Sequence, residues 1–172
     1  MQRVLALFRE RDTRDELGLG AIRDAFSDRL FPGTSTIQTR IRYFLFVPWI
    51  YRQLELERMS SSRMAREGRE REMRLRDALM DEASADVDGV FGRSAGRALK
   101  RLASEVYWAG LGAWRIRRFP GSIRDYFQAQ DGIHRVRSRA REHSDDPAFA
   151  DVETWHPDLP GPPENLSLIH IS

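Results

Sequence analysis

The stretch from Phe31 to Arg42 combines residue types that bind phosphate. A Pro-Gly turn is followed by hydroxyl side chains, an amide and two cations. The start of a helix presents unpaired backbone amides with a partial positive charge, and these attract anions. The sequence therefore predicts phosphate or nucleic-acid contacts here, although an ordinary capped helix would have the same pattern. The predicted contacts are Thr34, Ser35, Thr36, Gln38, Arg40 and Arg42.

A second cluster of this kind surrounds Gly121. Its predicted phosphate contacts are Arg117, Arg118, Ser122 and Arg124. Both clusters follow the same pattern, in which GLGA (Gly18–Ala21 or Gly110–Ala113) precedes FPG. Each copy predicts a helix, a tight turn and a new helix, and the recurrence is explained either by internal duplication or by coincidence.

Charge is segregated along the chain. Residues 1–92 are balanced, residues 93–143 carry twelve positive and four negative groups, and residues 144–172 carry six negative groups and no positive ones. A basic block of this density indicates a polyanion partner such as nucleic acid. The acidic tail either folds over this block or only solubilises the chain.

Several kinds of chemistry are excluded or unsupported. The absence of cysteine excludes disulfides, thiolate nucleophiles and thiolate zinc sites. Gly18-x-Gly20 is followed by Arg23 where a dinucleotide fingerprint needs a third glycine, and the four histidines lack metal-ligand spacing. We therefore predict no catalytic residue, cofactor or metal. No long apolar run is present, so we expect a cytoplasmic protein without a membrane contact.

The pattern of apolar residues predicts an all-α, irregular multi-helix domain. Leu19, Ile22, Phe26 and Leu30 predict a helix over 19–31 with one buried stripe. Ser35 and Gln38 form a capping box that predicts another helix from about residue 36 to 47. Together these helices resemble a helix-turn-helix unit.

Residues 41–51 are the most apolar stretch, and we favour helix over strand for them. Pro48 is expected to break or kink this helix and to start the next one, which would run to about Arg58. The aromatic residues of this stretch are expected to form the core rather than to stack nucleic-acid bases.

The remaining boundaries follow from caps and composition. Ser60–Ser62 is expected to cap a solvated, charge-laced helix, Ser104 a later helix, and Ser122 with Asp125 a last helix that ends near Arg141. The i,i+4 ion pairs expected in the charged helix are Glu67 with Arg71, Glu70 with Arg74 and Glu72 with Arg76. We thus expect a helical domain over 1–143, with a sub-boundary near 59–63, and an extended, poorly ordered acidic tail over 144–172.

Two segments carry a family resemblance. Asp15–Tyr51, which contains FPGTSTIQTRIRYFLFVPW, resembles the signature of an uncharacterised bacterial protein family, and Tyr107–Ser122 resembles that family's second signature. The resemblance implies a place in a bacterial multi-protein system for phage defence or DNA processing. The last residues, 166–172, resemble a translated sequencing adaptor, so we expect a fragment whose C-terminal region is missing.

Three functions remain open on this basis. The leading prediction is a non-enzymatic module that binds nucleic acid or phosphate. The alternatives are a structural or protein-interaction scaffold with protein partners, and the N-terminal part of an enzyme whose active site lies outside this chain. DNA binding measured across salt concentrations separates the first two, because phosphate neutralisation makes affinity depend on salt.

Overall fold

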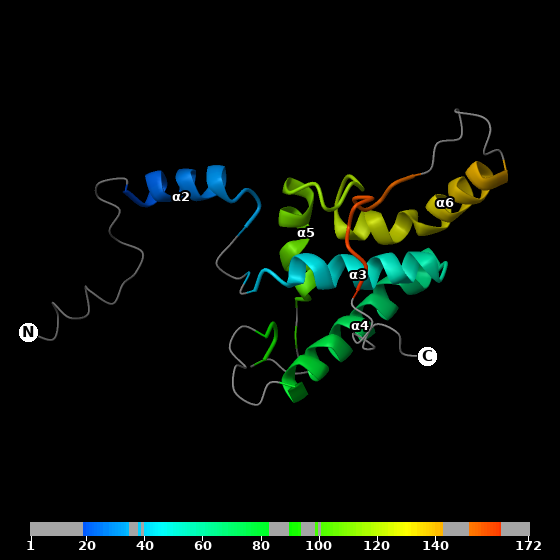
Figure 1. Cartoon of the computed structure of the whole chain (residues 1–172), viewed down its shortest axis with the longest axis horizontal. Helices are drawn as coiled ribbons and strands as arrows, with labels where there is room; N and C mark the ends of the chain where they lie inside the picture. Colours follow the sequence, from blue (N-terminus) through cyan, green and yellow to red (C-terminus); the bar gives the residue numbers. More distant parts are fainter. Residues whose placement is uncertain are drawn as a thin grey trace, which may run out of the picture. The chain divides into compact units, whose positions relative to one another are not determined.

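The structure, a computed structural model, describes residues 19–34, 38, 40–82, 90–93, 99, 101–142 and 152–162. Its elements are the helices α2 (Leu19–Leu30), α3 (Tyr43–Leu56), α4 (Ser61–Glu82), α5 (Ala103–Ala113) and α6 (Ile123–Glu142) (Figure 1). These residues form no β-sheet, and only an isolated bridge joins Arg117 to Trp155. The predicted all-α fold is confirmed. The chain divides after Pro32 into two compact units.

The first unit contains α2, where a helix was predicted. The predicted buried stripe is wrong, because Ile22, Phe26 and Leu30 are 52%, 61% and 64% exposed. The side chain of Leu19 lies outside the described residues. A stripe is buried only against another element, and the described part of this unit consists of little besides α2 itself.

The second unit is built around α3. Helix α3 packs on α4 and α5, and α6 packs on the same two helices. The largest fully buried side chains include aromatic rings from three helices, Tyr51 of α3, Tyr107 of α5 and Tyr126 of α6. The aromatic residues of 41–51 therefore belong mainly to the core, as predicted.

Helix α3 differs from its predicted boundaries. It begins at Tyr43 rather than near residue 36, and Gln38 and Arg40 are not helical. It continues through Pro48 to Leu56, although proline removes one helical hydrogen bond. Burial of the side chains on both sides of Pro48 compensates for this loss. Helix rather than strand is confirmed for this stretch, but residues 31–42 make a longer connection than a helix-turn-helix unit has.

Helix α4 begins at the predicted serines but is not uniformly solvated. Met64, Gly68, Glu72 and Leu75 form a buried stripe along it. The predicted ion pairs are replaced by others: Glu67 pairs with Arg63 and Arg66, each at 3.1 Å, Arg71 pairs with Glu57, and Arg76 pairs with Asp77. Three of these pairs join neighbours within α4, one of them at i,i+4, and only the Arg71–Glu57 pair is a tertiary contact.

Caps explain where the last two helices begin. Helix α5 starts at Ala103, so the predicted cap at Ser104 is wrong, and the Leu102 amide donates to Glu105 Oε2 at 3.1 Å instead. Helix α6 has its predicted cap: the Ser122 amide donates to Asp125 Oδ2 at 2.8 Å, and the Asp125 amide donates to Ser122 Oγ at 3.2 Å.

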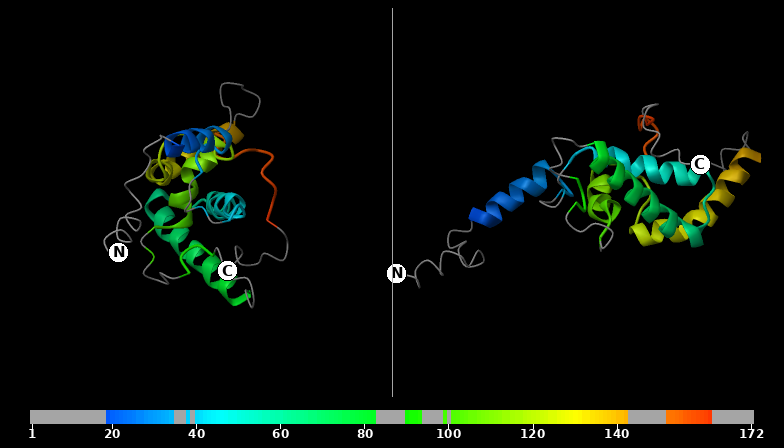
Figure 2. Two further views of the ribbon diagram at one scale, coloured as in Figure 1. Left: turned by 90° about the vertical axis from the view of Figure 1, so that its left-hand side faces the viewer. Right: turned by 90° about the horizontal axis from the view of Figure 1, so that it is seen from below.

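Residues 152–162 run without helix along the second unit (orange to red in Figures 1 and 2). Thr154, Trp155 and Leu159 are buried, and Trp49 Nε1 donates to the Pro160 carbonyl at 2.6 Å. The sequence predicts an extended, poorly ordered tail over this stretch. These residues nevertheless contribute to the core, and they lie over part of the basic block.

Candidate functional site

The first predicted phosphate cluster is joined to α5 by hydrogen bonds. Gln38 Nε2 donates to the carbonyls of Gly33 and Val106, each at 3.1 Å. The backbone of Arg40 exchanges two hydrogen bonds with Tyr107 Oη, at 3.1 and 2.9 Å. Among the predicted contacts, Ser35 and Thr36 lie outside the described residues, Thr34 is half-buried, and Arg42 exposes its side chain just before α3.

The two glycine patterns meet in the structure. A β-carbon on Gly33, of the first FPG, would lie 2.9 Å from Gly110 Cα, of the second GLGA. A β-carbon on Gly110 would in turn lie 2.9 Å from the Gly33 carbonyl oxygen. Gly33 and Gly121 also both adopt positive φ, at +72° and +88°. Close backbone approach and turn geometry therefore account for these glycines without a ligand.

The second predicted cluster is used partly for internal contacts. The Arg117 guanidinium lies 4.6 Å from the centroid of the Trp108 ring and donates to the carbonyls of Phe119 and Gly121. Arg118 pairs with Glu153, and Ser122 caps α6. Arg124 is exposed. The two predicted clusters thus both contact α5.

A pocket of about 280 Å³ lies elsewhere on the second unit. Three segments line it: the end of α3, the second half of α6 and residues 152–157. The lining residues are Arg52, Glu55, Leu56, Arg58, His134, Arg137, Arg141, Val152, Glu153, Thr154, Trp155, His156 and Pro157. Of these residues, Arg137 and Arg141 are four apart in the sequence, a spacing that places both on one face of α6.

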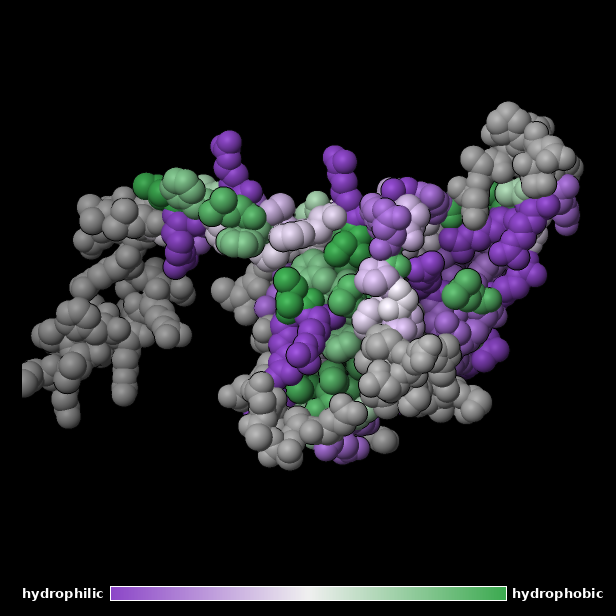
Figure 3. Space-filling model, in the orientation of Figure 1, coloured by the Kyte–Doolittle hydropathy of each residue, from purple (hydrophilic) through white to green (hydrophobic). Residues whose placement is uncertain are grey.

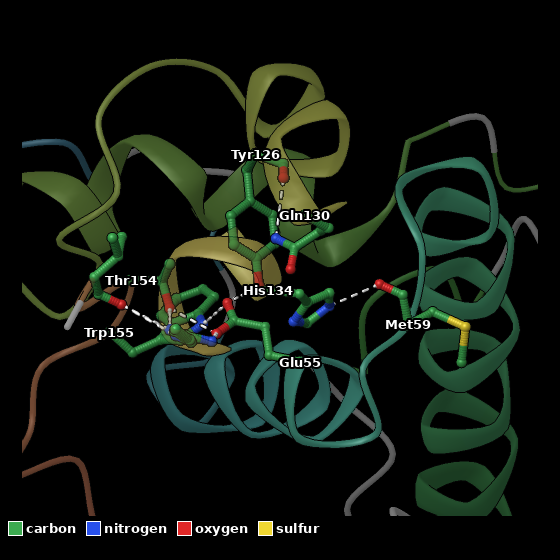
Figure 4. Close-up of polar contacts among 9 residues, drawn as sticks. Glu55, Met59, Tyr126, Gln130, His134, Thr154 and Trp155 are labelled. Atoms are coloured by element: carbon green, nitrogen blue, oxygen red, sulfur yellow. Dashed lines mark hydrogen bonds and ion pairs between the residues drawn. The ribbon is translucent and has the colours of Figure 1, made fainter. Parts of the chain in front are cut away.

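Glu55 is one of the residues that line this pocket, and it is 5% exposed. Figure 4 shows its polar contacts. Its Oε2 accepts hydrogen bonds from Arg137 Nη1 and Thr154 Oγ1, each at 2.7 Å. Its Oε1 accepts from Trp155 Nε1 at 3.0 Å and from Tyr126 Oη. A carboxylate offers about four lone-pair sites, so these four donors saturate it. Glu55 therefore joins three segments and has no lone pair left for a ligand.

Burial keeps the Tyr126 hydroxyl in its donor form. Removal from water raises the pKa of Tyr126 well above its ordinary value, and the nearby Glu55 carboxylate raises it further. Arg137 completes the network, since its guanidinium also donates to the Val152 carbonyl, at 2.9 and 3.2 Å, and to Thr154 Oγ1 at 3.0 Å. Hydrogen bonds thus hold Glu55, Arg137, Thr154 and Trp155 in place in the lining of the pocket.

Three arginines of the pocket form no ion pair within the described ranges. Arg52 donates to the Leu159 carbonyl at 3.1 Å, Arg58 donates to Ser138 Oγ, and Arg141 is exposed. None of the three has a carboxylate partner among the described residues, because Glu55 is paired with Arg137 and Glu153 with Arg118. Figure 3 shows that hydrophilic side chains also gather over α6. Clustered, unpaired arginines in a concave site attract anions.

Arg58 occupies a backbone position that usually holds glycine. Its φ is +57°, and it follows the end of α3, where the Met59 amide donates to the Leu54 carbonyl at 2.9 Å and the Arg58 amide to Glu55 at 3.0 Å. This is a Schellman motif, whose left-handed residue is most often glycine. Arg115 has a similar φ of +58° after α5 but does not line the pocket.

Two histidines add a polar rim. His134 Nε2 lies 3.0 Å from the Met59 carbonyl, so this nitrogen carries the proton of the ring (Figure 4). His156 Nδ1 accepts from the Asp158 amide at 3.2 Å. The neutral His156 ring therefore carries its proton on Nε2, which is available as a donor.

Comparisons with known proteins identify a family but no activity. Searches of curated proteins and of solved structures give no match. Among the described residues, no helix has the length and apolarity needed to cross a membrane, and no three His, Asp or Glu side chains are grouped to hold a metal. The model of the Family of unknown function (DUF6361) matches residues 1–168, and the chain belongs to this family.

Proposed function

We propose that the second unit is a non-enzymatic module that binds nucleic acid through its phosphates, with the pocket arginines as the main contacts. One observation carries this proposal: Arg52, Arg58 and Arg141 line one pocket without a carboxylate partner among the described residues. Guanidinium groups bind phosphate oxygens through paired, charge-assisted hydrogen bonds.

Further residues extend the proposed surface. Arg42 and Arg124 expose their side chains, and they stay proposed contacts together with the other residues of the two predicted clusters. From the family resemblance we also propose a place in a bacterial multi-protein system for defence or DNA processing.

A titration of labelled DNA with the whole chain, repeated at several salt concentrations, tests the proposal. We expect binding at low salt and a linear fall of log affinity with log salt, because each neutralised phosphate releases counterions. The absence of binding at low salt would overturn the proposal.

A protein-interaction scaffold is the alternative function, and one observation favours it. Helix α2 and the residue after it expose Ile22, Phe26, Leu30 and Phe31, each by more than half. Contiguous exposed apolar groups are typical of protein contacts. A scaffold of this kind would show no salt-dependent DNA binding, so the same titration separates the two functions.

A further inference from the structure

We infer that the pocket takes a terminal phosphate, a monoester at the end of a nucleic-acid strand, rather than an internal phosphodiester. This inference rests on the proposed function and names the part of the nucleic acid that the pocket recognises.

The size of the pocket is the first argument. At about 280 Å³ it is at the small end of the range for ligand pockets, and three separate segments form its walls. An internal phosphate continues into the chain through two ester bonds, whereas a terminal phosphate continues through only one. A small pocket whose lining is partly held by hydrogen bonds suits a group that enters from one side.

Charge is the second argument. A phosphate monoester carries about −1.5 to −2 at neutral pH, whereas a diester carries a single negative charge. Three arginines share the pocket and have no carboxylate partner in the part of the chain that the structure describes. One monoester offsets more of this positive charge than one diester does, and a pocket of this volume leaves little room for several diesters.

The donor set is the third argument. A monoester presents three terminal oxygens as acceptors, whereas an internal diester presents two. The pocket offers the guanidinium groups of Arg52, Arg58 and Arg141, together with His156 Nε2. These groups can satisfy a fully exposed phosphate head, and none of them is needed to saturate Glu55.

The backbone conformation of Arg58 is the fourth argument for a ligand at this pocket. Holding a non-glycine residue at φ +57° costs about 1 kcal/mol or more. The Arg58 side chain crosses to Ser138 on α6 and lines the pocket there. Arg115 has the same backbone conformation outside the pocket and provides a matched control.

The test compares three short DNA strands of one sequence, with an internal fluorophore and with a 5′-phosphate, a 3′-phosphate or only hydroxyl ends. We expect the whole chain to bind one phosphorylated strand about tenfold more tightly than the hydroxyl strand. Arg58→Gly and Arg141→Gln should abolish this preference, and Arg115→Gly should keep it. Circular dichroism of each variant verifies that it is folded.

The contradicting outcomes are distinct. Equal affinity for all three strands, with binding still dependent on salt, would overturn the terminal-phosphate inference and leave the proposed function intact. The absence of binding to any strand would overturn both. Displacement of the strand by a nucleoside monophosphate at the same concentration would assign the pocket to free nucleotides and overturn the strand-end assignment. A preference that survives in both pocket variants would also overturn it.

Discussion

Gly68 of α4 lies directly against the ring of Tyr51 of α3. A β-carbon at position 68 would come within 2.7 Å of both Tyr51 Cε1 and Tyr51 Oη. The Tyr51 hydroxyl is itself held, because it donates to Glu72 Oε1 at 2.8 Å. The glycine that weakens α4 by its helix propensity therefore permits the contact between α3 and α4.

The first prediction concerns Gly68→Ala. Helix propensity alone predicts that alanine stabilises α4 by about 1 kcal/mol. We expect a loss of about 1–3 kcal/mol instead, because the added methyl group displaces a fully buried tyrosine. Urea denaturation followed by circular dichroism measures the change.

Gly132→Ala is the matched control for this prediction. Gly132 lies in α6, and a β-carbon there would meet nothing within 4 Å. This variant should gain about 0.5–1 kcal/mol, as propensity predicts. A stability gain in both variants would contradict the packing role of Gly68.

The second prediction concerns the pH dependence of stability. Burial raises the pKa of Glu72 above its ordinary value of 4.5, although the Ser104 amide and hydroxyl and the Tyr51 hydroxyl partly oppose the shift. The folded chain therefore binds more protons than the unfolded chain between these two pKa values. The contribution of Glu72 to the free energy of unfolding must then fall as pH rises from about 4.5 through the raised pKa.

Glu72→Gln removes this titration while keeping an acceptor for the Ser104 amide. The difference in unfolding free energy between Glu72→Gln and the natural chain should grow in favour of the variant as pH rises through this window. Urea denaturation from about pH 4 to about pH 8 measures it, with Glu70→Gln, at an exposed position of the same helix, as the control. A difference that does not change with pH would show that Glu72 titrates as it does in the unfolded chain.

The third prediction concerns Glu55→Ala. Four donors, among them the Arg137 guanidinium, lose their acceptor, and breaking a buried ion pair costs about 3–5 kcal/mol. Residues 152–156 should detach first. Hydrogen exchange should therefore accelerate at the amides of Arg118, Phe119 and His156, because their backbone hydrogen bonds involve this stretch.

Glu153→Ala is the control for this prediction. It breaks only an exposed ion pair and should cost at most about 1 kcal/mol. Similar costs in both variants would contradict the central place of Glu55.

The fourth prediction concerns the two arginines with positive φ. Arg115→Gly relieves the backbone and should raise the free energy of unfolding by about 1 kcal/mol. Arg58→Gly gains the same backbone freedom but loses its bond to Ser138, so its gain should be smaller. Thermal and urea denaturation measure both. A large loss of stability in Arg58→Gly would mean that Arg58 serves the fold rather than a ligand.

The sequence predicts local structure well where the signal itself is local. The cap of Ser122 with Asp125 and the spacing of apolar residues in α2 locate these helices within about one turn. It misplaces the start of α3, because Gln38 and Arg40 bond to Val106 and Tyr107, far along the chain. The predicted burial of the apolar stripe of α2 is wrong for a similar reason, since periodicity indicates an apolar face but not what covers it.

The pocket could not be predicted for the same physical reason. Its walls come from α3, α6 and residues 152–157, and no short motif links Arg52 to Arg141. The i,i+4 spacing placed Arg137 and Arg141 on one face, but not the pairing of Arg137 with Glu55 that leaves Arg141 available. The number of cations in the second predicted cluster overstates how many are available to a ligand, because Arg117 makes contacts within the fold.

The most direct test of the pocket compares Arg141→Gln with Arg135→Gln in DNA titrations at several salt concentrations. Both residues are exposed on α6 and both variants lose one positive charge, but only Arg141 lines the pocket. We predict that Arg141→Gln weakens binding severalfold and lowers the slope of log affinity against log salt by about 1, whereas Arg135→Gln changes both much less. Equal effects of the two variants would contradict the assignment of phosphate binding to this pocket.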